Sequence, residues 1–140
     1  MNNIEPTLFD SYRDLYRPYV NAVNTRLSKY QLHTSQWVVM RLIYLKESCT
    51  FVELAKDTRV EKPSVTRIIQ KLMELGYVET NQGDDKREKY VSLTEKGKEV
   101  YTSIQEDLST YLNELTQGID EADLKTTRNV LNQILENLLR

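Results

Sequence analysis

The chain has 140 residues, 39% of them hydrophobic and 29% charged, and a formal net charge of −2, which fits one globular domain with or without a helical extension. It has no apolar run of about 18 residues, so we expect no membrane-spanning helix, and its first residues lack a basic segment followed by an apolar one, so we expect no secretory signal. A single cysteine, Cys49, excludes an internal disulfide framework and fits a reducing cytoplasm.

The segment from Pro6 to Tyr30 predicts a long amphipathic helix. Its apolar residues recur at steps of three and four: Leu8, Tyr12, Leu15, Tyr16, Tyr19, Val23, Leu27 and Tyr30. Pro18 interrupts this stripe. Because an interior proline removes a backbone hydrogen bond and clashes with the preceding turn, we expect a kink there or two abutting helices.

Two shorter helices are predicted next. Thr34 is the expected N-cap of a helix from Ser35 to Lys46. The residues expected on its buried face are Trp37, Met40, Ile43 and Tyr44. A third helix covers roughly residues 52–57, with Leu54 and Ala55 pointing inward.

A fourth helix is predicted from Lys62 to Gly76, with Pro63 in its first turn and the glycine at its end. One side of its helical wheel is apolar: Val65, Ile68, Ile69 and Leu72. The other side is polar: Pro63, Ser64, Arg67, Gln70 and Lys71, with Thr66 on the flank. The polar side is therefore the one that a partner would contact.

A hairpin and two long helices complete the chain. Residues 77–80 and 90–93 predict its strands. Thr94 is suited to cap a fifth helix and Gly118 to end it. The apolar stripe of this helix is Val100, Ile104, Leu108, Tyr111 and Leu115. Asp120 is suited to cap a sixth helix, whose apolar residues are Leu124, Leu131, Ile134, Leu135, Leu138 and Leu139.

These elements predict a mainly α (α+β) fold, a winged helix-turn-helix with dimerisation helices at both ends. The expected segments are 1–33 for N-terminal dimerisation, 34–97 for DNA binding and 98–140 for C-terminal dimerisation. Leu131, Leu138 and Leu139 would be exposed in a monomer, which favours a two-fold homodimer over an intramolecular bundle of the same helices. Such a dimer would set two recognition helices roughly 34 Å apart on an inverted-repeat site.

The charge is unevenly distributed. From Lys56 to Lys89 there are eight Lys or Arg and seven Asp or Glu, whereas from Lys98 to Arg140 there are four and eight. The acidity therefore lies mainly in the C-terminal helices. Because the central module is only mildly basic, we expect modest non-specific affinity for DNA that depends strongly on salt.

Spaced motifs in the second half of the chain make it resemble the MarR family of bacterial winged-helix regulators. The first is D-x-R followed by V-x-L-T-x-x-G, present as Asp85-Lys86-Arg87, Val91-Ser92-Leu93-Thr94 and Glu95-Lys96-Gly97. The others are Lys62-Pro63-Ser64-Val65-Thr66-Arg67 with Leu72 and Gly76-Tyr77-Val78, and Leu32 with Gln36 and Trp37. The resemblance covers nearly the whole chain and implies a homodimeric regulator of transcription.

The polar side of the fourth helix supplies the candidates for reading bases: Ser64, Thr66, Arg67 and Gln70. Arginine can bind guanine O6 and N7, and glutamine can bind adenine N6 and N7. Lys62 and Lys71 are candidates for phosphate contact or are simply solvated. The alternative for the whole set is an ordinary solvated helix face.

The resemblance implies that Arg87, at the tip of the wing, enters the minor groove, which concentrates negative potential where it is rich in A·T pairs. Asp85 would orient Arg87 through an ion pair, and Lys86 and Lys89 would add non-specific charge. The alternative for Asp85 and Arg87 is a surface ion pair that stabilises the hairpin only slightly.

The nine tyrosines suggest a second kind of site. In the family, small aromatic effectors often bind between the dimerisation helices and the winged module, and the candidates for such a pocket are Tyr12, Tyr16, Trp37 and Tyr44. Tyr19 shares the face of the first two tyrosines. The alternative, that these rings pack the core and the interface, is the more ordinary role for aromatic side chains.

Three features depart from the family pattern. Arg59 and Glu61 stand in the turn where the family often has a glycine and a serine cap, and Pro18 is not a family feature. Cys49 is not where peroxide-sensing members keep their cysteine, so thiol-based sensing is not expected. One histidine, His33, and one cysteine cannot form a structural zinc site, and we expect no cofactor.

The sequence also argues against an enzyme, because it has no Ser/His/Asp set and no glycine-rich phosphate loop. We therefore expect a cytoplasmic homodimer that binds double-stranded DNA at an inverted repeat, acts as a repressor and is released by a small aromatic effector. The alternative is a winged-helix module that binds proteins and not DNA. The mild central charge and Glu61 favour that alternative.

Overall fold

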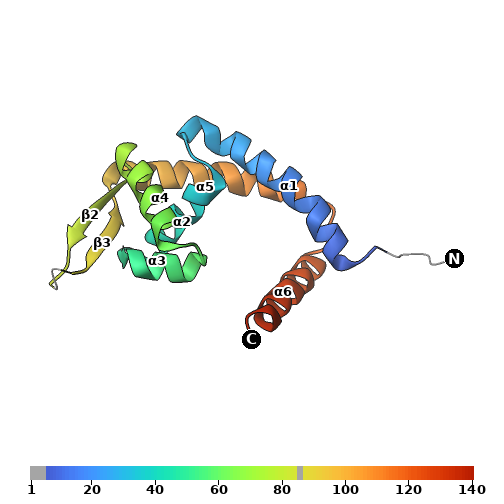
Figure 1. Ribbon diagram of the computed structural model, residues 1–140. Helices are drawn as coiled ribbons and strands as arrows, with labels where there is room; N and C mark the ends of the chain where they lie inside the picture. Colours follow the sequence, from blue (N-terminus) through green and yellow to red (C-terminus); the bar gives the residue numbers. More distant parts are fainter. Residues whose placement is uncertain (1–5, 85–86) are drawn as a thin grey trace. The chain divides into compact units, whose positions relative to one another are not determined.

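The computed structural model describes residues 6–84 and 87–140. Its elements are, in chain order, α1 (Leu8–Leu27), η1 (Ser28–Tyr30), α2 (Thr34–Lys46), β1 (Cys49–Thr50), α3 (Phe51–Thr58), α4 (Lys62–Glu74), β2 (Val78–Gln82), β3 (Lys89–Leu93), α5 (Glu95–Leu115) and α6 (Glu121–Leu138), as Figure 1 shows. This mainly helical α+β order confirms the predicted winged helix-turn-helix. The chain forms two compact units, Met1–Leu108 and Ser109–Arg140.

Helix α1 begins with a capping box between Thr7 and Asp10. The Asp10 amide donates to Thr7 Oγ1 at 3.2 Å, and the Thr7 amide donates to Asp10 Oδ2 at 2.9 Å. The helix continues through Pro18 as one element, so the alternative of two abutting helices is wrong. Only its last turns are buried, at Val23 and Leu27.

The start of α2 corrects the predicted cap. The N-cap is His33, whose amide donates to the Gln36 side chain at 2.7 Å, and not Thr34. The amide and the hydroxyl of Thr34 instead both donate to Asn24 Oδ1, at 2.7 and 2.6 Å. Thr34 therefore joins α2 to α1, because the helix begins one residue earlier than predicted and the Thr34 side chain bonds to another helix.

The buried face of α2 also differs from the prediction at one residue. Trp37, Met40 and Ile43 are buried as expected, but Tyr44 is 44% exposed. Val39 is buried in addition. Tyr44 uses only one face of its ring for packing, against Tyr101 of α5, and the remainder meets solvent.

The helix-turn-helix consists of α3, α4 and the turn between them. Thr50 caps α3 by accepting a hydrogen bond from the Glu53 amide at 3.1 Å. Arg59 ends α3 with φ +56°, a left-handed backbone conformation that is unusual for residues other than glycine. Glu61 is the N-cap of α4, and its side chain makes no cap hydrogen bond.

The wing is an antiparallel sheet with strand order β1-β3-β2. Val78 pairs with Leu93 and Gln82 with Lys89, so β2 extends two residues beyond its predicted end. Figure 1 shows the β2–β3 hairpin projecting away from helices α2, α3 and α4. The third strand, β1, pairs Cys49 with Val91 and was not predicted, because two residues carry no recognisable alternation.

The core of the first unit lies between the end of α1, α2, the helix-turn-helix, the wing and α5. Its fully buried side chains include Ile43, Leu54, Val65, Ile69, Leu72, Val91 and Ile104. Each such aliphatic side chain stabilises the fold by roughly 1.5–3 kcal/mol relative to exposure. The core therefore holds α4 by its apolar side, as the helical wheel predicted.

The second unit, all of whose residues the structure describes, has no buried side chain. Gly118, with φ +83°, forms the left-handed turn before α6. Exposed apolar residues follow: Ile119, Val130, Leu131, Leu135, Leu138 and Leu139. The predicted exposure of Leu131, Leu138 and Leu139 is confirmed. Among the described residues, no helix has the length and apolar content needed to cross a bilayer.

Candidate DNA interface

The polar side of α4 is uncovered by the described part of the chain. Val65, Ile69 and Leu72 are buried in the core, whereas Lys62, Arg67 and Gln70 on the other side are exposed. Ser64, Thr66 and Lys71 are half-buried at the flanks. The helical spacing of the apolar residues places all six polar side chains on the accessible part of one helix.

Hydrogen bonds distinguish the candidate base-reading residues from one another. Arg67 Nη2 donates to Ser64 Oγ at 3.1 Å, which uses one of the five N–H donors of the guanidinium group. The Thr66 hydroxyl donates to the Lys62 carbonyl oxygen at 3.1 Å, so its proton is already used within the helix. Compared with Thr66, Arg67 therefore keeps more N–H donors for a base, and its hydrogen bond with Ser64 holds its side chain in place.

The wing holds Arg87 next to the hairpin tip, where the residue is exposed. Asp85 and Lys86, two further predicted residues, lie outside the described residues. Gly83 closes the tip: its amide donates to the Glu88 carbonyl at 3.2 Å, and a Cβ at this position would overlap the Tyr90 ring. The Tyr90 hydroxyl donates to Glu88 Oε2 at 3.0 Å. These contacts link Gly83, after β2, to Glu88 and Tyr90 on the β3 side of the hairpin.

The junction between α4, the wing and α5 explains the Leu-Thr-x-x-Gly motif. The Thr94 hydroxyl donates to the Gly76 carbonyl at 2.6 Å and accepts from the Gly97 amide at 2.9 Å. Lys96 Nζ donates to the Leu75 carbonyl at 3.0 Å. A side chain on Gly97 would overlap the Tyr77 carbonyl oxygen. The motif therefore fastens the end of α4 to the start of α5.

Carboxylates of α3 are partly neutralised from α2. Lys46 Nζ lies 2.9 Å from Asp57 Oδ2 and 3.7 Å from Glu53 Oε2. The hydrogen bond with Asp57 is the main cause that raises the pKa of Lys46. Because these side chains are partly exposed, the pairs stabilise the fold only slightly. Their effect on the interface is to reduce the negative potential of α3.

Cys49 lies in β1, where it pairs with Val91 of β3 and is fully buried. Burial is the main cause that raises the pKa of its thiol to about 11. Since the thiolate is the reactive form, this thiol is poorly suited to peroxide chemistry at neutral pH.

We therefore expect the Cys49→Ser variant to bind DNA as the wild type does, with neither protein losing affinity after exposure to hydrogen peroxide. Gel shifts before and after oxidation measure this, with mass spectrometry reporting the oxidation state of Cys49. A wild-type protein that released DNA on oxidation, beside a Cys49→Ser variant that did not, would contradict the expectation.

The predicted aromatic residues fall into two groups. Trp37 and Tyr44 both stack on Tyr101, and their ring centroids lie 5.1 and 3.9 Å, respectively, from the centroid of the Tyr101 ring. Tyr12 and Tyr16 contact each other on α1 at 5.9 Å, and both are 55% exposed. Tyr101 was missed from the sequence because it lies beside the predicted stripe of α5.

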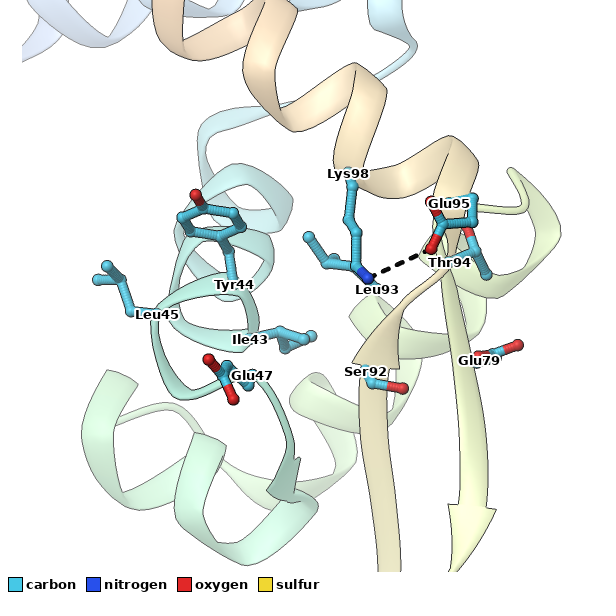
Figure 2. A pocket seen from close by; sticks show the side chains of 10 residues that line it. All are labelled: Ile43, Tyr44, Leu45, Glu47, Glu79, Ser92, Leu93, Thr94, Glu95 and Lys98. Carbon is cyan, nitrogen blue, oxygen red and sulfur yellow. Dashed lines mark hydrogen bonds and ion pairs between the residues drawn. The ribbon is translucent and has the colours of Figure 1, made fainter.

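A pocket of about 740 Å³ lies next to this aromatic group, and Tyr44 is the only one of the four predicted ligand residues among those that line it. Its lining, shown in Figure 2, consists of Ile43, Tyr44, Leu45, Glu47, Glu79, Ser92, Leu93, Thr94, Glu95 and Lys98. Lys98 Nζ pairs with Glu95 Oε1 at 3.3 Å. The pocket thus joins the end of α2, the base of the wing and the first turn of α5.

Comparisons of the sequence place the chain among known regulators. Residues 32–89 match the model of the MarR family. An uncharacterized HTH-type transcriptional regulator of Staphylococcus aureus (strain Mu50) is 30% identical, over 94% of this chain and 92% of that protein. The uncharacterized HTH-type transcriptional regulator YwoH of Bacillus subtilis (strain 168) is 29% identical, over 97% of this chain and 99% of that protein.

Two solved structures extend the similarity to three dimensions. A Staphylococcus aureus MarR in complex with salicylate and kanamycin has a TM-score of 0.85 and 30% identity, covering 94% of this chain and 89% of that chain. A cysteine-to-serine mutant of MarR from E. coli, complexed with operator DNA, has a TM-score of 0.75 and 27% identity, covering 93% of this chain and 99% of that chain. Both similarities span the winged helix-turn-helix and the flanking helices.

Proposed function

The chain belongs to the MarR family of DNA-binding transcriptional regulators, and from this premise we propose that it is a cytoplasmic repressor that binds an inverted-repeat operator as a homodimer. The observation that carries the proposal is the uncovered polar side of α4 beside a projecting hairpin. A helix held by its apolar side with its polar side free is the arrangement that enters a major groove. Repression would follow sterically, where the operator overlaps a promoter.

We assign the residues of the interface by their chemistry. Arg67 and Gln70 read base edges, with Ser64 and Thr66 beside them, and Lys62 and Lys71 contact phosphates. Arg87 contacts the minor groove, and the roles expected for Asp85 and Lys86, which lie outside the described residues, are to orient Arg87 and to add charge. Segment 34–97 is the DNA-binding domain in this proposal.

The homodimer is supported by two exposed apolar surfaces. One lies on α1, where Leu8, Phe9, Tyr12, Leu15 and Tyr16 are exposed, and the other lies on the second unit. Surfaces of this kind on a regulator usually mark an interface, and a second copy of the chain covers both if residues 1–33 and 98–140 dimerise. Sedimentation velocity would then give a mass of two chains.

We further propose that a small aromatic effector releases the protein from its operator. The support is the aromatic group around Tyr101, to which Trp37 and Tyr44 belong, and the complex of the Staphylococcus aureus MarR with salicylate. Tyr12 and Tyr16 form a separate exposed aromatic pair on α1, which would contribute to the effector site only through a second copy of the chain. For release, the effector must bind more tightly to a dimer conformation in which the spacing of the two recognition helices does not fit the operator.

Gel shifts with a pool of inverted-repeat duplexes, at roughly 50 and 200 mM salt, test the function. We expect specific complexes that weaken steeply with salt, and a matched Arg67→Ala/Gln70→Ala variant that retains only non-specific binding. A stable dimer that binds no duplex at either salt concentration would favour the alternative of a protein-binding module, for which the N-cap carboxylate of Glu61 is the supporting feature.

The wing gives a separate prediction. Arg87→Ala is expected to weaken binding mainly at operators with A·T-rich flanks, because a narrow minor groove attracts an inserted cation most strongly. Titration of matched operators with A·T-rich and G·C-rich flanks measures this. Lys89→Ala, which removes a charge from the same hairpin, is the control and should weaken both about equally. An equal loss on both operators for Arg87→Ala would contradict minor-groove shape reading.

A further inference from the structure

Tyr77 directly follows the recognition helix and bonds to the end of α1. Its amide donates to the Leu72 carbonyl at 2.9 Å, which ends α4. Its hydroxyl donates to the Tyr30 carbonyl oxygen at 2.9 Å. The Tyr77 side chain is only 5% exposed, so this hydrogen bond is shielded from solvent. One residue thus connects the end of α4 to the end of the α1–η1 segment.

Tyr30 continues the connection to α5. Its hydroxyl donates to Asp107 Oδ2, and Lys29 Nζ lies 2.7 Å from the same oxygen. The hydrogen bonds from Lys29 and Tyr30 lower the pKa of Asp107, because both stabilise the charged form of its carboxyl group. Charge-assisted hydrogen bonds of this kind are stronger than neutral ones.

The position of Asp107 along α5 gives the connection its mechanical effect. The end of α4 is already fastened to the first turn of α5, through Thr94 and Lys96. Asp107 lies 11 residues beyond Lys96, or roughly 16 Å along the helix axis. The end of α4 is thus joined to α5 directly near Lys96 and, through Tyr77 and Tyr30, near Asp107, and the second connection limits how the end of α4 can shift relative to α5.

We propose that Tyr77, Tyr30 and Asp107 are positioning residues that set the angle of the recognition helix to α1 and α5, and so select the spacing of the two half-sites. Apolar packing beneath these residues is non-directional and permits sliding, whereas the hydrogen bonds fix an orientation. The inference rests on the proposed homodimer and inverted-repeat operator. It adds to them the residues that determine which operator spacing the dimer accepts.

Duplexes that carry identical half-sites at centre-to-centre spacings of about 8 to 13 base pairs, which bracket one helical turn, form the first test. We expect the wild type to prefer one spacing, and Tyr77→Phe to reduce that preference about fivefold, the effect of losing one hydrogen bond. Tyr30→Phe is expected to act in the same direction. The matched control is Thr102→Val, which removes a hydroxyl that donates to the Lys98 carbonyl oxygen within α5, outside this connection.

A second measurement does not depend on DNA. A spin label at Glu74→Cys, an exposed position on α4, reports the distance between the two recognition helices by pulsed electron resonance. Cys49 stays in place because it is buried, and the protein without Glu74→Cys controls for its labelling. We expect Tyr77→Phe to broaden or shift the distance distribution, and Thr102→Val to leave it unchanged.

The outcomes separate the inference from the function on which it rests. If the wild type binds with a preferred spacing and Tyr77→Phe keeps both that preference and the distance distribution, the positioning role is overturned while the repressor proposal stands. If the label gives no distance because the protein is monomeric, the proposed homodimer is overturned and the spacing role with it. Equal losses of spacing preference in Tyr77→Phe and Thr102→Val would indicate a general structural effect and overturn the assignment.

Discussion

Replacing Arg67 with alanine is expected to lower affinity for the operator about ten- to hundredfold and to relax the base preference at one position of each half-site. Arg67 is exposed on α4 and has donors beyond the one that Ser64 accepts. The loss should therefore fall on specific complexes, while binding to unrelated DNA changes little. Selection from a randomised half-site, followed by titration of the selected duplexes, measures both quantities.

Two further variants make the result specific to base reading. Lys71→Ala is expected to weaken specific and non-specific binding alike and to reduce the salt dependence by about one unit of slope, because a phosphate contact carries no sequence information. Ser64→Ala removes the hydroxyl that accepts from Arg67 and should give a smaller loss at the same base position. If Arg67→Ala left the selected sequence unchanged, direct readout by this residue would be refuted.

Gly97→Ala is expected to destabilise the fold by about 3 kcal/mol, the upper end of the range for overpacking a close contact. A Cβ at this position would overlap the Tyr77 carbonyl oxygen, which is backbone and cannot rotate away. Helix propensity alone predicts the opposite sign, since alanine is favoured over glycine within a helix by about 1 kcal/mol. The free energy of unfolding in urea, at equal protein concentration, decides between them.

Gly118→Ala is the control for a glycine without such a contact. Gly118 has φ +83°, and apart from its two chain neighbours no described residue has an atom within 4 Å of the place where a Cβ would stand, so only backbone strain of roughly 1–2 kcal/mol is expected. A Gly97→Ala protein that is as stable as the wild type, or more stable, would show that Tyr77 and α5 can separate without loss.

The motif that best identified the family is mainly structural. Thr94 and Gly97 hold α5 against the end of α4, and neither is exposed. Contacts between backbone segments require particular residues, because few side chains fit them, and this leaves a clear pattern in the sequence. The proposed base-reading residues leave a weaker pattern, since their identity depends on the operator.

The sequence predicted the helices, the hairpin and the side of α4 that enters the core because these depend on periodicity. Val65, Ile69 and Leu72 recur at helical steps, and they are buried as expected. Glycine and proline marked the ends of α4, at Gly76 and Pro63, through their backbone preferences. Local rules of this kind need no knowledge of the neighbours of a helix.

Elements that depend on a distant partner were missed or misplaced. Strand β1 exists because Cys49 and Thr50 pair with β3, about forty positions later, and its two residues have no pattern of their own. Tyr44 was expected in the core and is 44% exposed, because Tyr101 covers only one face of its ring. Thr34 was expected to cap α2 and bonds to Asn24 of α1.

The sequence by itself determined the fold class, the family and the polar side of the recognition helix, because each is written in local spacing. Only the tertiary structure decided how that helix is held: Tyr77 bonds to Tyr30, and Tyr30 to Asp107, across separations of 47 and 77 residues. Hydrogen bonds between such distant positions form only after the core has brought their helices together. Their geometry follows from packing, and no periodicity along the chain encodes it.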